Sequence, residues 1–364
     1  MDWPRFHAKT ADMSAKPLPM PVFAAAALSP VPLIGLGVWL GGVWLWAGFL
    51  YTALLVIVLD QLIPYVAGNA EEGAEFPAAD ALLVAVGLGV VLLLPLTVWG
   101  ITSDHLDTGE KLLLFFGTST FLGHVGHPCA HELIHRPGRA LYRLGVLVYS
   151  MMLFGHHASA HRLVHHVHVA TEKDPNSARA GESFWRFAPR AFWGGFRAGK
   201  AAEDALRARR RGQNGVHPYV WYLGIGGACL ILGAAIGGPF GALIWLLLAA
   251  HAQMQQLLGD YVQHYGLTRA RLTDGRYEPV GPRHSWNTPH WFSSALMLNA
   301  PRHSDHHAHP ARPYPALRLT EDAPLLPWPL PVACALAMAP RLWHRLMKRH
   351  LRRWAATAGQ EPAQ

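Results

Sequence analysis

Residues 79–99, ADALLVAVGLGVVLLLPLTVW, carry a single charged side chain, Asp80. A helix of about 20 apolar residues is long enough to cross the hydrocarbon core of a bilayer. Similar apolar runs lie near residues 21–40, 42–62, 112–130, 219–236 and 238–259. The sequence therefore predicts an all-α integral membrane protein with six transmembrane helices.

The overall composition agrees with this class. The 364 residues are 51% hydrophobic and only 15% charged, whereas soluble domains are about 25% charged. The pair Gly41-Gly42 predicts a hairpin between the first two spans, and Gly237-Gly238-Pro239 predicts a turn between the last two. Two polar segments, 131–217 and 260–323, are expected to form a helical cap. We expect one domain over residues 1–364.

The basic residues predict how the bundle is oriented. Lys and Arg are enriched in loops that stay in the cytoplasm, and arginines follow the fourth span (Arg136, Arg139, Arg143) and precede the fifth. The short loop 103–110 is acidic and lacks Lys and Arg. Both termini and both polar segments are therefore expected in the cytoplasm, although the acidic loop 63–78 gives this topology no support. The net charge of +8 needs no nucleic-acid partner.

Four short clusters contain nine histidines. HELIH (131–135) and HRLVHH (161–166) follow the fourth span, DYVQHYGL (260–267) follows the sixth, and RHSDHH (302–307) comes later. Residues three or four apart share one face of a helix, so each multiple cluster directs imidazoles to one side. The candidate ligands are His131, His135, His161, His165, His166, His264, His303, His306 and His307. Three or four ligands satisfy one zinc ion, so nine predict two metal ions.

The ligand type narrows the choice of metal. Imidazoles without thiolates suit Fe, Zn, Cu or Ni, and two neighbouring irons that activate O2 are the favoured interpretation. Cys129, Cys229 and Cys334 are isolated, so they predict neither a disulfide framework nor a CxxC electron-transfer module. The reductant is expected to come from a separate protein.

Residues beside the clusters are candidates for supporting roles. A carboxylate that accepts the free ring N–H of a histidine ligand fixes its orientation, and Glu132, Asp174 and Asp305 are close enough in sequence to do so. Asp174-Pro175 is equally consistent with a simple turn. His284 is a candidate for a similar supporting role beside the ligands or for a structural role at the surface.

Two further features have alternative interpretations. Trp39, Trp44, Trp46 and Tyr51 could line a substrate channel, or anchor the spans in the membrane interface as Trp and Tyr often do. Residues 341–354 form a basic amphipathic helix, which predicts an interfacial location. Docking of an acidic partner on that helix is the alternative.

Other functions are open at this point. HELIH also matches the HExxH motif of zinc proteases, in which Glu132 would be the general base. That reading would leave seven clustered histidines without a role. A metal-storage or transport protein is a further alternative.

Several motifs resemble those of bacterial membrane alkane hydroxylases, which are relatives of membrane fatty-acid desaturases and xylene-type methyl monooxygenases. The similar stretches are HELIHR, HRLVHHVHVATEKDPNSARAGES, DYVQHYGL, DGRYEPVGPRHSWN and PRHSDHHAHPARPYPALR. The resemblance implies a six-span bundle in the bacterial inner membrane, with the nine histidines as ligands of two irons on the cytoplasmic side. It also implies O2-dependent terminal hydroxylation of a medium- or long-chain alkane to a primary alcohol, with electrons from a rubredoxin-type donor and its reductase.

The chain departs from the family pattern at four positions. In the second motif, Ala160 replaces the usual Glu before the first histidine, and Val164 replaces the usual Gly before the paired histidines. Arg136 replaces the Lys that usually ends the first motif, and Asp260 replaces the Asn that usually opens the DYVQHYGL motif. None of these changes removes a candidate ligand. A fatty-acid desaturase or hydroxylase and an aromatic-methyl monooxygenase remain alternatives, because they would share the metal site.

The basic residues near the histidine motifs also suggest contacts. Arg136, Arg139, Arg162 and Arg302 are candidates for docking an acidic electron donor. Anchoring of the loops to lipid is the alternative.

Overall fold

A computed structural model describes residues 15–63, 65–210 and 215–358. In these ranges the chain is helical, and β-pairing is limited to isolated bridges such as Val66 with His290. The all-α class predicted from the sequence is thus confirmed. The helices are α1 Met20–Leu28, α2 Pro30–Leu40, α3 Gly42–Leu50, α4 Val56–Leu62, α5 Ala79–Thr102, α6 Thr108–Phe121, α7 His127–His135, α8 Arg139–Met151, α9 His157–Ala160, α10 His166–His168, α11 Phe184–Arg209, α12 Pro218–His264, α13 Trp291–Leu296, α14 His303–Ala308, α15 Leu330–Ala337 and α16 Pro340–Ala358.

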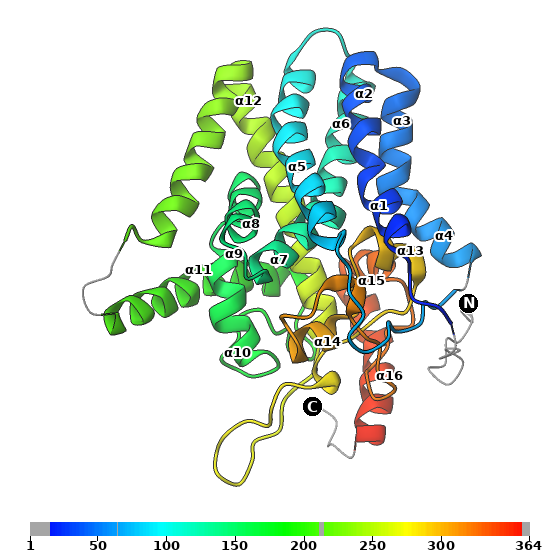
Figure 1. The fold of residues 1–364 in the computed structure, drawn as a ribbon, viewed down its shortest axis with the longest axis vertical. Helices are drawn as coiled ribbons and strands as arrows, with labels where there is room; N and C mark the ends of the chain where they lie inside the picture. Colours follow the sequence, from blue (N-terminus) through cyan, green and yellow to red (C-terminus); the bar gives the residue numbers. More distant parts are fainter. Residues whose placement is uncertain (1–14, 64, 211–214, 359–364) are drawn as a thin grey trace.

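Short π and 3-10 turns connect some of these helices. The π turns are η2 Tyr51–Leu55, η3 Leu122–Gly126 and η4 His161–His165, and the 3-10 turns are η5 Pro282–His284 and η6 Tyr314–Ala316. Helices α2, α3, α5, α6 and the upper part of α12 stand side by side in the upper part of the molecule, and α7, α10, α11 and α13 to α16 lie in its lower part (Figure 1).

Four helical segments are long and apolar enough to cross a membrane. They are Met20–Leu40, Gly42–Leu62, Ala79–Thr102 and Pro218–His264. The first two meet at Gly41, whose positive φ of 62° suits glycine because it lacks a Cβ. The predicted hairpin at Gly41-Gly42 is therefore confirmed.

The 47-residue helix α12 is two helices that meet at a kink. Gly237 and Gly238 have non-helical backbone angles, and Gly238 has a φ of 63°. The two halves approach so closely beside the kink that a Cβ on Gly241 would collide with the carbonyl oxygen of Gly233. The predicted turn at this position is confirmed, and the two halves diverge below it (Figure 1).

The run at 112–130 differs from the other predicted spans. It is divided among α6, η3 and α7, and it is not among the four long apolar helices. Polar side chains such as Thr118, His124 and His127 interrupt its apolar character. The count of six spans consequently stays a prediction.

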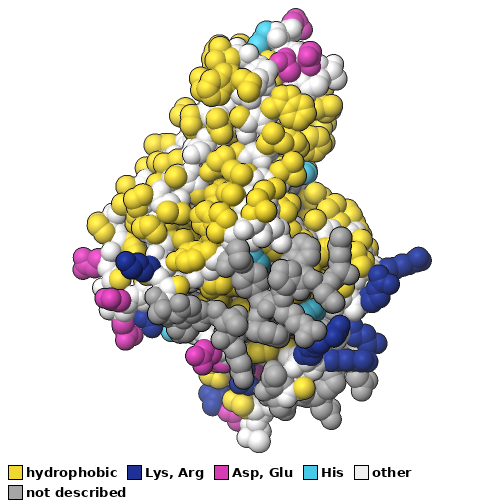
Figure 2. Space-filling model, turned by 90° about the vertical axis from the view of Figure 1, so that its right-hand side faces the viewer, with side chains coloured by type: hydrophobic (Ala, Val, Ile, Leu, Met, Phe, Trp, Pro, Cys, Tyr) yellow, Lys and Arg dark blue, Asp and Glu magenta, His cyan; other side chains and the backbone are white. Residues whose placement is uncertain are grey.

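The two ends of the bundle differ in charge. At the upper end, Asp107 and Glu110 form a capping box at the start of α6, and Glu110 Oε1 also accepts the backbone N–H of Gly42 at 2.7 Å. Figure 2 shows acidic side chains at this end, apolar side chains over the upper body, and Lys and Arg only in the lower part of the same face. This division matches a bundle whose apolar surface meets lipid.

Buried polar contacts fix the lower helices to the bundle. Asp60, near the end of the second span, accepts the backbone N–H groups of Phe292 (2.8 Å) and Ser293 (3.2 Å) at the start of α13. An acidic side chain is favourable there because a helix N-terminus carries unsatisfied N–H groups and partial positive charge.

The C-terminal helix α16 has its apolar face covered by this chain. Trp343 and Met347 are fully buried, and the Trp343 ring lies 6.0 Å from that of Tyr261 and 5.5 Å from that of Tyr265. The face that the sequence suggested for the membrane interface is thus packed against the end of α12. Its basic side chains remain exposed.

Candidate metal centre

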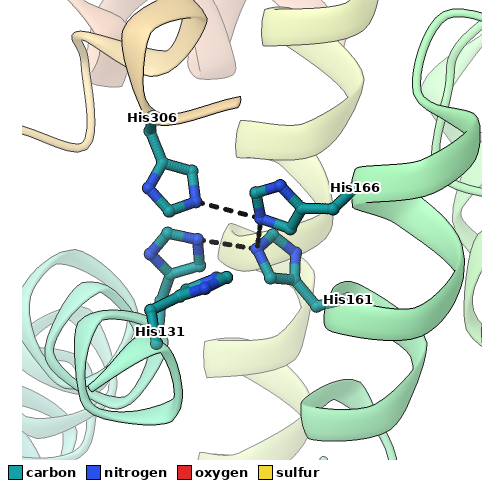
Figure 3. Close-up of side chains that lie close together, drawn as sticks. His131, His161, His166 and His306 are labelled. Atoms are coloured by element: carbon teal, nitrogen blue, oxygen red, sulfur yellow. Dashed lines mark hydrogen bonds between the residues drawn. The ribbon is translucent and has the colours of Figure 1, made fainter. Parts of the chain in front are cut away.

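The four histidine motifs converge at the lower end of the bundle. His131 and His135 lie on α7, His264 ends α12, and His303, His306 and His307 lie on α14. His161 and His165 lie in the π turn η4, and His166 begins α10. Figure 3 shows imidazoles from α7, η4, α10 and α14 directed toward one centre.

All nine predicted histidines fall into two adjacent groups, within each of which the potential ligand atoms lie within 4.8 Å of one another. The groups touch, since the rings of His166 and His307 have centroids 4.6 Å apart. The five-histidine group contains His131, His135, His161, His166 and His306, and the four-histidine group contains His165, His264, His303 and His307.

The π turn η4 determines how the histidines of the second motif are divided between the two groups. A regular α-helix would place His161 and His165 on one face, but here His161 and His166 belong to one group and His165 to the other. A π turn forms i→i+5 hydrogen bonds, so the angular spacing of an α-helix does not hold across it. This single turn therefore supplies ligands to both groups.

The nitrogen spacing is close to that of a coordination sphere. His161 Nε2 lies 2.8 Å from His131 Nε2 and 2.9 Å from His166 Nε2, and His306 Nε2 lies 3.1 Å from His166 Nε2. Around an ion with metal–nitrogen bonds of about 2.1 Å, ligand atoms lie about 3.0 Å apart at right angles and about 3.4 Å apart in a tetrahedron. These three nitrogen–nitrogen distances are close to the right-angle value.

The four-histidine group has the same spacing. His303 Nε2 lies 3.0 Å from His264 Nε2 and 3.1 Å from His307 Nε2. The fourth member, His165, directs its ring toward the rings of His264 and His307, with centroids 4.7 Å away in each case.

Six ring nitrogens of the nine histidines are buried and lack a hydrogen bond among the described residues, namely Nδ1 of His161, His166, His306 and His307 and Nε2 of His135 and His165. The last two atoms belong to different groups. An unsatisfied buried polar atom is costly, and a metal ion would satisfy both atoms. Together with the all-nitrogen donor sets, these atoms fit two transition-metal ions.

The electrostatics keep the imidazoles in the form that binds metals. Burial, reinforced by neighbouring imidazoles, lowers the pKa values of His161, His303 and His307 well below the ordinary value. Burial also lowers the pKa of His131 to about 3. These rings are therefore neutral near neutral pH, and a neutral ring nitrogen has a free lone pair.

Asp174 is the carboxylate that contacts a group histidine directly. Its Oδ2 lies 2.8 Å from His165 Nδ1, and it also accepts the Ser177 hydroxyl at 2.7 Å. Burial alone would lower the pKa of His165, but the Asp174 carboxylate outweighs it and raises this pKa. The contact holds Nδ1 protonated, so that Nε2 is left to face the four-histidine group.

The other predicted outer residues have different partners. Glu132 lies 3.9 Å from His131 Nδ1, too far for a hydrogen bond, and accepts instead from Arg136 and from the Tyr314 backbone N–H. Asp305 faces away from the rings and accepts from Arg312 and from the backbone N–H of Arg318.

His284 supports the four-histidine group only through its backbone. Its ring lies 3.2 Å from Glu278 Oε1, while its backbone forms a hydrogen bond with the ring of His264. The neighbouring Ser285 hydroxyl lies 3.4 Å from His264 Nδ1. Ser285 had no distinguishing signal in the sequence, because a serine between histidine motifs is an ordinary loop residue.

Asp260 is a further buried carboxylate near this group. It accepts from Asn176 Nδ2 at 2.7 Å and from Gln256 Nε2 at 3.0 Å. It lies one helical turn before His264 on α12. Its position in the third motif was visible in the sequence, but its partners on the distant segment around Asn176 were not.

A small cavity touches both histidine groups. It has a volume of about 70 Å³ and is lined by His131 of one group and His303 of the other, together with side chains such as Leu258, Met297 and Leu330. It lies between η3 and α7 on one side and α12, α14 and α15 on the other.

The four aromatic residues predicted to line a channel are not part of this cavity lining. Trp39 and Trp46 are 60% and 53% exposed, and Trp44 is half-buried. The Tyr51 hydroxyl donates to the carbonyl oxygen of Ala26 at 3.1 Å. The exposure of the two tryptophans on an apolar span suits the alternative of interface anchors.

Two of the arginines considered for docking are occupied inside the protein. Arg302 is buried and donates to the carbonyl oxygens of Ala67 and Leu317 at 2.6 and 2.8 Å. Arg136 forms ion pairs with Asp80 and Glu132. Burial excludes Arg302 as a docking contact.

Comparison with known proteins agrees with the fold and with the histidine motifs. Residues 111–333 match the model of the fatty acid desaturase family. Alkane 1-monooxygenase 2 of Pseudomonas aeruginosa is 32% identical, covering 87% of this chain and 86% of the relative, and alkane 1-monooxygenase 1 of that organism is 33% identical over 87% and 85%. The xylene/toluene monooxygenase hydroxylase component of Pseudomonas putida is 26% identical over 88% and 86%. The chain therefore belongs to the fatty acid desaturase family and is an alkane 1-monooxygenase-like membrane enzyme.

Proposed function

We propose that this protein is an O2-dependent monooxygenase that hydroxylates the terminal methyl group of an apolar, membrane-dissolved substrate at two irons. A medium- or long-chain alkane is the favoured substrate. The observation that carries the proposal is the pair of adjacent all-histidine groups with a cavity that reaches both. The names of the alkane 1-monooxygenase relatives support the reaction class.

The protein residues have separable roles. The five-histidine group would hold one iron and the four-histidine group the other. When bound, the irons would supply the O2 activation and C–H oxidation that amino-acid side chains cannot perform. Asp174 holds the ring of His165 in the orientation that presents Nε2, and burial of seven of the nine histidines keeps bulk water from the reacting carbon.

The cavity sets what approaches the metals. Its apolar lining includes Leu258, Met297 and Leu330, whereas Gln255 and Gln256 are polar. A volume of about 70 Å³ admits the end of a chain rather than a whole lipid. We therefore propose that a terminal methyl group enters between His131 and His303.

The electrons must come from another protein. The three cysteines are free, and Cys129 and Cys229 are buried, so the described chain offers no thiolate pair for electron transfer. We propose a rubredoxin-type donor with a separate reductase. The exposed side of α16 carries Arg341, Arg345, Lys348, Arg349, Arg352 and Arg353 and suits an acidic donor.

The same proposal includes the topology. Six spans in a bacterial inner membrane would place the histidine groups at the cytoplasmic side, where a soluble donor reaches them. On the face in Figure 2, Lys and Arg lie only in the lower part, which supports this orientation because Lys and Arg are enriched in cytoplasmic loops.

Product analysis under isotopically labelled dioxygen (¹⁸O2) tests the function. Purified full-length enzyme would receive rubredoxin, its reductase and NADH, with octane, hexadecane, p-xylene or palmitate as substrate. We expect a primary alcohol from an alkane, with one ¹⁸O atom per product, because the oxygen comes from O2.

The alternatives give different results in the same assay. Conversion of palmitate to an unsaturated fatty acid without ¹⁸O indicates a desaturase. Formation of ¹⁸O-labelled methylbenzyl alcohol from p-xylene, with no alcohol formed from an alkane, indicates an aromatic-methyl monooxygenase. Peptide hydrolysis in the absence of O2 would instead support the HExxH protease. Each of these outcomes would contradict alkane hydroxylation.

A further inference from the structure

A second, larger cavity lies outside the metal centre. It is a groove of about 720 Å³ between the start of α8 and the first turns of α12. Its charged lining residues are all arginines, and its other walls are mainly apolar or aromatic. The lining includes the four arginines Arg136, Arg139, Arg143 and Arg162, together with Val146 and Trp221.

Three of these arginines are available to a ligand. Arg139, Arg143 and Arg162 are exposed and form no ion pair with a carboxylate of the described residues, whereas Arg136 is held by Asp80 and Glu132. Arg139 and Arg143 are four residues apart on α8 and therefore share one face. The Arg162 guanidinium lies over the Tyr142 ring, 5.1 Å from its centroid, which holds a third positive charge at the same rim.

The apolar wall of the groove belongs to a membrane span. Trp221 and Ile225 lie in the first turns of α12, whose segment is long and apolar enough to cross a bilayer. Trp221 is 58% exposed, and tryptophan favours the boundary between lipid headgroups and acyl chains. The groove thus joins a cluster of guanidinium groups to an apolar surface at the depth of that boundary.

We propose that this groove binds an acidic glycerophospholipid of the surrounding membrane, with its phosphate between Arg139, Arg143 and Arg162 and an acyl chain along Val146, Trp221 and Ile225. Arginine recognises phosphate through charge-assisted, bidentate hydrogen bonds. The apolar wall favours a lipid over an acidic protein, which would need a polar rim on both sides. This lipid site is separate from the cavity at the histidine groups, so it does not depend on the proposed reaction.

Photolabelling of the full-length protein tests the site. The protein would be placed in phosphatidylcholine nanodiscs that contain a minor fraction of phosphatidylglycerol with a diazirine in its acyl chain. We expect labelled peptides from residues 139–146 and 216–225, and competition by unlabelled phosphatidylglycerol but not by added phosphatidylcholine. An anionic lipid gains about fivefold in affinity for each nearby Lys or Arg.

Charge-removing variants provide the matched comparison. The triple variant Arg139→Gln, Arg143→Gln and Arg162→Gln should lower labelling by more than about tenfold. The control triple Arg345→Gln, Arg349→Gln and Arg352→Gln removes the same charge from α16, which lies away from the groove (Figure 1), and should leave labelling of these peptides unchanged. Circular dichroism would confirm that each variant is folded.

Three outcomes would overturn the proposal. Equal loss in both triple variants would show a general effect of positive charge. Unchanged labelling in the groove variant would show that the arginines do not hold the lipid. Unchanged lipid labelling combined with weaker binding of the electron donor to the groove variant would assign the arginines to protein docking.

Discussion

Replacing His306 by alanine is expected to reduce the bound iron from two ions per chain to about one and to lower turnover to below about one hundredth of the wild-type rate. His306 Nε2 lies 3.1 Å from His166 Nε2 within the five-histidine group, so under the proposed assignment its loss removes one direct ligand. Changes to residues that merely support a ligand already cost about 10- to 100-fold. Iron analysis and product formation from octane measure the two effects.

Two further variants make this result specific. His168→Ala alters a histidine of α10 that lies outside both groups and should retain both irons and full turnover. His303→Ala should instead deplete the four-histidine group. Full iron content and full turnover in the His306 variant would show that this histidine is not a ligand.

The second large effect is expected at Asp174. Replacing it by asparagine keeps the size of the side chain but removes the negative charge 2.8 Å from His165 Nδ1. Without that charge, the ring of His165 loses its fixed tautomer and is a weaker ligand, so we expect about 10- to 100-fold weaker iron binding. Titration of the iron-loaded protein with a chelator, monitored by the absorbance of bound iron, measures the change in iron affinity.

An exposed carboxylate provides the control. Asp204 pairs with Lys200 at 2.8 Å on the surface of α11. Replacing Asp204 by asparagine should leave unchanged the midpoint of the titration, which is the chelator concentration that removes half of the iron. If Asp174→Asn only lowered the thermal stability and left the midpoint in place, Asp174 would be a structural residue of the loop after α10.

Much of the architecture could be predicted from local sequence. Apolar runs of about 20 residues identify helices that can cross a membrane, and glycine pairs at Gly41-Gly42 and Gly237-Gly238 mark the turns. The span at 112–130 is harder, because its polar side chains serve the interior of the bundle rather than lipid. A hydropathy pattern does not distinguish these two environments.

The histidines of the centre were predictable, but their division was not. Spacing alone identifies which rings lie near one another on a helix, and all nine do lie in the two groups. The π turn at His161–His165 has no simple signature in the sequence, and it sends His165 to the other group. The pairing of α7 with α14 likewise depends on tertiary packing.

The supporting carboxylates show the limit of sequence proximity. Asp174, eight residues after His166, contacts His165, whereas Asp305 lies between two group histidines and faces Arg312 instead. Which way a side chain points depends on helix register and on residues distant in the chain. The same reason explains α16, whose amphipathic pattern does not reveal whether its apolar face meets lipid or, as here, Tyr261 and Tyr265.

One departure from the family pattern lies at a close helix contact. Ala160 is buried, and its backbone lies where a Cβ on Gly199 of α11 would collide with it. α11 therefore packs closely against the start of the second motif. A larger side chain at position 160 would have to displace that helix or point elsewhere.

The metal content of the purified wild-type protein distinguishes a di-iron centre from a zinc site. Protein expressed in iron-supplied cells and purified without chelators would be analysed for iron, zinc, copper and manganese by mass spectrometry, relative to protein measured by amino-acid analysis. The account predicts two irons per chain, one for each histidine group. One zinc per chain, with no iron, would contradict it.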